Sequence, residues 1–130
     1  MPARLVLVGL LALNLIACAS PREKAYRSAL NDYKHKNAVV VDFARAKVKQ
    51  LVTATKAFQV SVGRWPQTFL QLAEFAFSNS LPLDPTDFND VAFAALEDGS
   101  VQVRYDVNCA HFNTSQYSFT QTGTVNVKVK

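Results

Sequence analysis

Residues 42–66 read DFARAKVKQLVTATKAFQVSVGRWP, and this stretch decides most of the fold. Gly63 is the kind of residue that ends a helix, and Pro66 suits the first turn of the next one. Before Gly63, apolar or small side chains recur at the three- and four-residue spacing of one helix face: Ala44, Val48, Leu51, Thr55, Phe58 and Val62. The stretch therefore predicts a long helix, a corner and a second helix.

The helical pattern extends upstream of this stretch, and a strand pattern replaces it downstream. No Gly or Pro interrupts residues 22–62, which we predict to be one helix, and residues 66–77 form a short second helix. Beyond residues 81–85, a turn-rich connector, the period changes to two. Helices first and strands afterwards predict an α+β fold, with both helices packed on a four-stranded antiparallel meander. The expected strands cover about residues 91–96, 100–108, 115–120 and 124–130.

The composition is that of an ordinary globular chain. Of its 130 residues, 49% are hydrophobic and 18% are charged, which excludes a disordered chain and indicates a single domain over residues 22–130. Two cysteines exclude a disulfide-stapled miniprotein, and four glycines give no support to a phosphate-binding loop. The charge is uneven, because residues 22–64 carry ten Lys and Arg against three acids, whereas residues 65–130 carry three against seven.

The first residues have the features of a targeting segment. A positive start at Arg4 precedes an apolar run, which together predict a signal peptide over residues 1–17. The run is shorter than the roughly 20 residues that a membrane-spanning helix needs. Its end, LIAC at residues 15–18, resembles the lipobox of bacterial lipoproteins, which implies cleavage before Cys18 and lipid attachment to its thiol. The alternative is a plain signal peptide with an incidental Cys, because ACA at residues 17–19 also fits ordinary cleavage.

The lipobox resemblance also implies a location. Cys18 would hold the chain on a membrane through lipid, and residues 18–21 would join this anchor to the domain. Lipoproteins retained in the inner membrane often carry Asp after the lipidated Cys, whereas Ala19 stands here, so the outer membrane is favoured. We therefore expect a protein of the bacterial cell envelope whose domain lies in the periplasm or at the cell surface.

A second resemblance covers about residues 42–108. The helix end, the GRWP corner at residues 63–66 and the LPLDP connector at residues 81–85 resemble type IV pilins and type II secretion pseudopilins. This implies a pilin-like interaction domain that serves a pilus, secretion or competence system. Convergence on a helix-on-sheet arrangement is the alternative. The charged residues 22–24 replace the hydrophobic, Glu-containing helix start of a pilin, so we do not expect this chain to polymerise as pilins do.

The residue pattern matches no catalytic signature. His35 and His111 lack partners at metal-ligand spacing. Cys109 and His111 lack an orienting acid, so a nucleophilic site there is only the third hypothesis. The parity of Cys109 with Val103 and Val107 predicts a buried thiol instead, and the alternative is an intermolecular disulfide. We therefore expect a non-enzymatic protein that uses no cofactor.

Acids at every third position suggest a metal site at Asp84, Asp87 and Asp90. Carboxylate oxygens from a loop are the ligands that Ca²⁺ takes. The resemblance to major pseudopilins, which bind Ca²⁺ in a loop near their sheet, points the same way. The favoured alternative is an ordinary turn, because Asp is a common turn former and no Gly supplies the sharp bend of a known calcium loop.

Basic side chains lie off the apolar line of the long helix: Arg45, Lys47, Lys49 and Lys56. We expect them to form a solvated face or to lie against anionic lipid headgroups. The alternative function uses the basic helix 22–64 as a membrane-displayed module that binds DNA or another polyanion. Nucleic acid is the less favoured partner, because aromatic residues do not clearly interleave with the basic ones. The favoured partner is another envelope protein.

Overall fold

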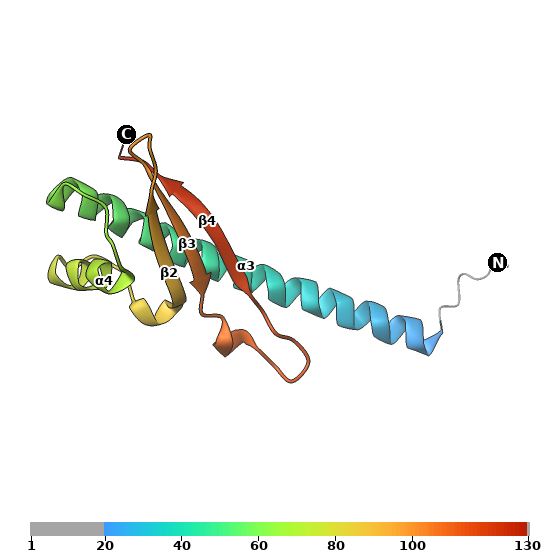
Figure 1. The fold of residues 1–130 in the computed structure, drawn as a ribbon. Helices are drawn as coiled ribbons and strands as arrows, with labels where there is room; N and C mark the ends of the chain where they lie inside the picture. Colours follow the sequence, from blue (N-terminus) through green and yellow to red (C-terminus); the bar gives the residue numbers. More distant parts are fainter. Residues whose placement is uncertain (1–19, 130) are drawn as a thin grey trace. The chain divides into compact units, whose positions relative to one another are not determined.

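The computed structural model describes residues 20–129, so the expected signal segment and Cys18 lie outside the described residues. The chain is divided into two compact units: the first ends at Lys36 and the second begins at Asn37. Figure 1 shows the elements in chain order: α3 (Pro21–Val62), α4 (Phe69–Ser78), β2 (Phe88–Ala95), β3 (Val101–Val107) and β4 (Gln121–Val127), with 3₁₀ turns at Pro85–Asp87 and Ala110–Phe112.

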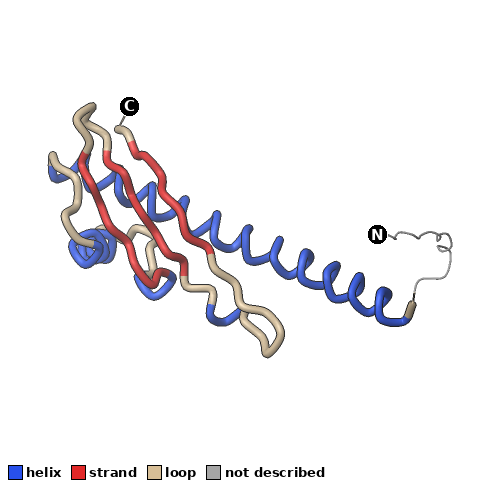
Figure 2. Tube along the Cα trace, turned by 45° about the vertical axis from the view of Figure 1, so that its right-hand side comes forward, coloured by secondary structure: helices blue, strands red, loops and turns tan. Residues whose placement is uncertain are grey.

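The α+β fold predicted from the sequence is confirmed. A long and a short helix precede an antiparallel sheet in which β3 lies between β2 and β4, as Figure 2 shows in red. The expectation of four strands is wrong for the described part of the chain, where the sheet has three. The missing strand is the one expected at residues 115–120.

The segment 115–120 is not a strand because local hydrogen bonds occupy its backbone. The Thr114 hydroxyl accepts from the N–H of Gln116, at 3.1 Å, and from that of Tyr117, at 3.0 Å. The N–H of Phe119 donates to Asn113 Oδ1 at 2.8 Å. Side chains of Thr and Asn commonly compete in this way with sheet formation. Alternation of Tyr117 with Phe119 therefore arises within a looped segment.

The last strand covers Gln121–Val127 rather than the expected 124–130, and Gly123 lies inside it. Gly123 is the β3–β4 partner of Tyr105. A Cβ at position 123 would lie 2.6 Å from the Tyr105 hydroxyl oxygen, so the aromatic side chain occupies the space above the glycine. An aromatic residue packed over a strand glycine replaces the contacts that the glycine lacks.

The β2–β3 hairpin turns at Asp98-Gly99. The N–H of Gly99 donates to the carbonyl of Leu96 at 3.1 Å, and the N–H of Leu96 donates to that of Ser100 at 2.9 Å. Gly99 has φ +88°, a left-handed conformation that favours glycine. This is the three-residue loop in which a turn is followed by a left-handed residue.

The core of the second unit lies between α3 and one face of the sheet. Its aliphatic side chains are each worth about 1.5–3 kcal/mol when fully buried, so the match between these two apolar faces holds the unit together. The helix contributes the buried residues Val40, Ala44, Leu51, Ala54, Thr55 and Phe58. The sheet contributes Val101, Val103, Val107 and Val127, and α4 adds Leu72 and Ala76.

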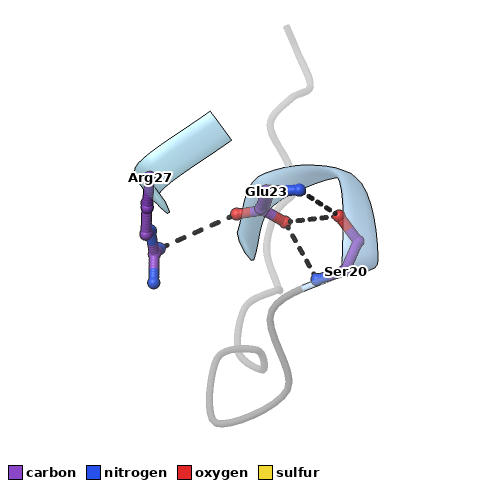
Figure 3. Close-up of polar contacts among 3 residues, drawn as sticks. All are labelled: Ser20, Glu23 and Arg27. Atoms are coloured by element: carbon purple, nitrogen blue, oxygen red, sulfur yellow. Dashed lines mark hydrogen bonds and ion pairs between the residues drawn. The ribbon is translucent and has the colours of Figure 1, made fainter. Parts of the chain in front are cut away.

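The first unit consists, in its described part, of the beginning of α3. Ser20 and Glu23 form a capping box: the Ser20 hydroxyl accepts from the Glu23 N–H at 3.1 Å, and the Glu23 carboxylate accepts from the Ser20 N–H at 3.5 Å (Figure 3). Arg27 reaches the same carboxylate at 3.8 Å. Within residues 20–129, no helix has both the length and the apolar character that crossing a membrane requires.

Candidate functional site

The candidate site is a groove beside the second half of α4, and the start of this helix is fixed by local hydrogen bonds. The Thr68 hydroxyl accepts from the N–H of Gln71 at 3.1 Å, while the Gln71 side chain accepts from the N–H of Gln67 at 2.9 Å. These bonds satisfy donors that the first helical turn leaves free. They also explain why α4 begins at Phe69 rather than at the expected Pro66.

The end of α4 forms one wall of the groove. Ser80 has φ +56°, and the N–H of Leu81 donates to the carbonyl of Ala76 at 2.9 Å, while the N–H of Ser80 donates to that of Phe77 at 3.3 Å. This is the Schellman arrangement, in which glycine usually takes the left-handed position. A serine there holds backbone strain of about 1 kcal/mol or more. The motif turns the chain sharply into the connector at residues 81–85.

Between α4 and this connector lies a groove of about 910 Å³. Leu72 and Ala76 are the buried residues of α4, and Ala76 also lines the groove. Phe77 is 89% exposed and Leu70, two helical turns earlier, is 68% exposed. The residues that line the groove include Ala73, Glu74, Phe77, Leu81, Leu83 and Pro85. Phe77 lines the groove, whereas Leu70 lies outside its lining on the same face of α4.

The three acids proposed as metal ligands have separate roles. Asp84 accepts from the Thr86 N–H at 2.9 Å and from its hydroxyl at 2.7 Å, and these two bonds lower the pKa of Asp84 below its ordinary value. Asp87 Oδ2 lies 3.1 Å from Lys47 Nζ, and Asp90 lies opposite Asp106 in the β2–β3 register. Among residues 20–129, no three His, Cys, Asp or Glu side chains are gathered so that they could hold a metal ion.

The four basic residues of α3 that were expected to form a solvated face have different surroundings in the structure. Lys47 is half-buried, pairs with Asp87 and lies 5.3 Å from the centre of the Phe43 ring, so it contributes to packing. Arg45 is exposed and lies 3.3 Å from Asp42. Lys49 and Lys56 are exposed, and their spacing of seven places them on one side of α3. Only part of the expected basic face is therefore turned to solvent without a neighbouring acid.

Cys109 lies in the core, which confirms the prediction of a buried thiol. It is 3% exposed, and burial together with the nearby Asp106 carboxylate raises its pKa. A buried thiol held in its protonated form packs as a small apolar group rather than acting as a nucleophile. His111 is exposed and contacts the rings of Phe112 and Phe43, at 4.1 and 5.0 Å between centroids. His35 is exposed on α3.

The groove is the feature that sequence reasoning did not find. Leu70 and Leu72, two residues apart in α4, differ in direction by about 200° and so lie on different faces of the helix. Two signals were present. Thr68 and Gln71 have the spacing of a capping box, which sets the helix start, and Leu70 and Phe77 share a face that Leu72 does not.

Comparisons of this chain with protein-family models, with curated proteins and with solved structures found no match.

Proposed function

We propose that this chain is a lipid-anchored protein of the bacterial cell envelope whose domain binds another envelope protein through the groove beside α4. The proposal has two separable parts, the anchor at Cys18 and the docking site. The exposed Phe77 at the groove carries the second part. The role is non-enzymatic and accessory to a pilus, secretion or competence system, as the resemblance of residues 42–108 to pilin-like domains suggests.

The chemistry of the groove indicates what it binds. Phe77 offers apolar surface in the groove and Leu70 adds more on the same face of α4; such side chains contribute most when a partner covers them. Glu74 lines the groove, and the exposed Asp84 lies in the chain between two lining residues, Leu83 and Pro85. The partner segment that fits is therefore apolar, flanked by Lys or Arg. The strained Ser80 supports this assignment, because backbone strain persists preferentially at functional sites.

The anchor is tested by Cys18→Ser with palmitate labelling and fractionation of membranes. The wild-type chain should carry label and partition into detergent, because several acyl chains hold a protein stably on a bilayer. The variant should lose both properties. Label or detergent partitioning that does not change in the variant would refute the anchor and leave the groove untouched.

The docking site is tested by placing a photo-crosslinking amino acid at Phe77 in intact cells. The control position is Val60, which is 70% exposed on α3 and does not line the groove. We expect a crosslinked partner from position 77 but not from position 60, and its loss in the charge-reversed variant Glu74→Lys. Equal adducts from both positions, or none from position 77, would contradict docking in the groove.

The second proposal, a module that binds DNA or another polyanion, is supported by the exposed Lys49 and Lys56. Contacts to phosphate weaken steeply with salt, by a slope of roughly one per phosphate contact in logarithmic terms. Duplex DNA should therefore bind at low salt, and Lys49→Ala with Lys56→Ala should reduce both affinity and slope. An unchanged affinity in this double variant removes the proposal.

A further inference from the structure

The outer edge of β4 presents backbone groups that have no strand beside them among the described residues. The N–H of Leu96 donates to the carbonyl of Ser100, so the even-numbered residues of β3 direct their backbone N–H and C=O groups toward β2. The backbone groups of successive residues point to opposite sides, so the odd-numbered residues of β3 bond to β4. The register pairs them with the odd-numbered residues of β4. Thr122, Thr124 and Asn126 therefore direct both N–H and C=O away from the sheet.

The opposite edge of the sheet is protected. A bulge lies between Phe88 and Asp90, and α4 lies beside β2, where the Phe69 and Phe88 rings are 5.6 Å apart (Figure 1). Bulges, charges and a covering helix are the devices that keep edge strands from pairing. Residues 121–127 of β4 contain no charge, no Pro and no bulge. The described sheet thus has one open edge.

Beneath the open edge lies a shallow hollow of about 230 Å³ between α3 and the sheet. A strand added beside β4 would direct alternate side chains toward this hollow and the others toward solvent. On the side of α3 the hollow is lined by the apolar Val41, Ala44 and Val48 together with Arg45, and on the side of the sheet by Tyr105 and Gln121. The edge offers both backbone bonds and a place for small apolar side chains.

We propose that β4 pairs with β4 of a second copy of this chain, antiparallel and centred on Thr124. The three outward residues are spaced evenly about Thr124, so a two-fold axis there places Thr124 opposite Thr124, and Thr122 opposite Asn126, of the second copy. The outward N–H and C=O groups of residues 122, 124 and 126 in one strand then form hydrogen bonds with those of the other strand. Lys128 lies opposite Thr120, so no like charges face each other.

A second copy fits this edge better than an unrelated strand for two reasons. The register above uses the same residues on both sides, which is the property of an isologous contact. Each described sheet has a single open edge, so pairing consumes both edges and gives a closed dimer rather than a fibre. On the inner face, Val125 of one copy lies opposite Gly123 of the other.

Cysteine crosslinking tests the register. Opposed bonded residues in an antiparallel pair have Cα atoms about 5.5 Å apart, within the range of a disulfide. Thr124→Cys in the full chain should therefore form a disulfide-linked dimer under mild oxidation. The matched control Thr122→Cys should not, because two copies of residue 122 lie more than about 13 Å apart in this register. Mixing Thr122→Cys with Asn126→Cys chains should restore the crosslink.

A proline variant tests the pairing without crosslinking. Thr124→Pro removes an N–H that faces away from β3, so the β3–β4 bonds remain, and edge strands tolerate Pro at such positions. Sedimentation velocity over a range of concentrations should show the wild-type chain dimerising and the variant monomeric, with the same circular dichroism. A wild-type chain that stays monomeric throughout overturns the proposal. So does Thr124→Cys that crosslinks no better than Thr122→Cys, or that crosslinks only to a different protein in cells.

Discussion

Two stretches of α3 have the same spacing of apolar side chains, but these side chains are buried in one stretch and exposed in the other. In residues 37–62, Val40, Leu51 and Phe58 are between 0% and 3% exposed, whereas in residues 20–36 Tyr26 is 70% exposed and Leu30 39%. Helical periodicity is present in both, so periodicity predicts the helix and does not by itself predict burial. Burial follows where the sheet covers the stripe. Because burial of apolar side chains stabilises a fold, we expect the second stretch to contribute more to the free energy of folding than the first.

The largest expected effect comes from truncating matched leucines in the two stretches. Leu51→Ala should lower the free energy of unfolding by about 2–5 kcal/mol, because it opens a cavity at a fully buried position. Leu30→Ala should change it by less than about 0.5 kcal/mol. Urea unfolding followed by circular dichroism measures both. Equal losses would mean that the first stretch is packed as tightly as the second.

Matched lysines make the comparison sharper. Lys47→Met should cost about 1–2 kcal/mol, because it leaves the buried Asp87 Oδ2 without its cation. Lys36→Met breaks the exposed pair with Asp32, 3.0 Å apart, and should cost less than about 0.5 kcal/mol. Urea unfolding of the two variants decides this, and a larger loss in Lys36→Met would contradict it.

The sheet that covers the second stretch depends on the fit between Gly123 and Tyr105. Gly123→Ala should destabilise the fold by about 1 kcal/mol, the low end of overpacking penalties, because the far end of the Tyr105 side chain can shift. Adding Tyr105→Phe removes the nearest atom and should recover part of the loss. Thermal unfolding of both single variants and the double variant tests the coupling, and strictly additive losses would refute it.

The smallest effect concerns the pH dependence of the hairpin. Bonds from the Ser100 side chain and backbone lower the pKa of Asp98 below its ordinary 3.8. A carboxyl whose pKa is lowered on folding stabilises above its unfolded pKa, and this contribution disappears as pH falls through the folded pKa. Asp98→Asn should therefore lose less stability than wild type between about pH 5 and about pH 2. Parallel curves for the two chains would contradict this.

Most of the fold follows from the sequence, and its exceptions have identifiable causes. The α3 stripe, the Asp98-Gly99 turn and the alternation around Val103 depend on spacing and turn chemistry, which are local properties. The strand expected at 115–120 fails because the Thr114 hydroxyl occupies N–H groups that a ladder would need. Gly123 lies outside the expected strand 124–130, because nothing local indicates that Tyr105, eighteen residues earlier, covers it.

The candidate site was less accessible from the sequence. The groove depends on the direction in which the chain leaves α4, which Ser80 sets by adopting a conformation that serine seldom takes. Among the basic residues, sequence spacing could not separate Lys47 from Lys49, because the partner of Lys47 is Asp87, forty residues away. The even spacing of Asp84, Asp87 and Asp90 in the sequence does not indicate that each carboxylate has different neighbours in the fold.

The indole of Trp65 gives the molecule a built-in optical reporter. Trp65 is the sole tryptophan of the sequence, and its N–H donates to the carbonyl of Gly99 at 3.0 Å, which joins the corner after α3 to the β2–β3 turn. Its fluorescence emission therefore reports on a contact between two segments that lie 34 positions apart in the chain. Separation of the hairpin from the helical corner would be visible in unlabelled protein, independently of the helix content of α3.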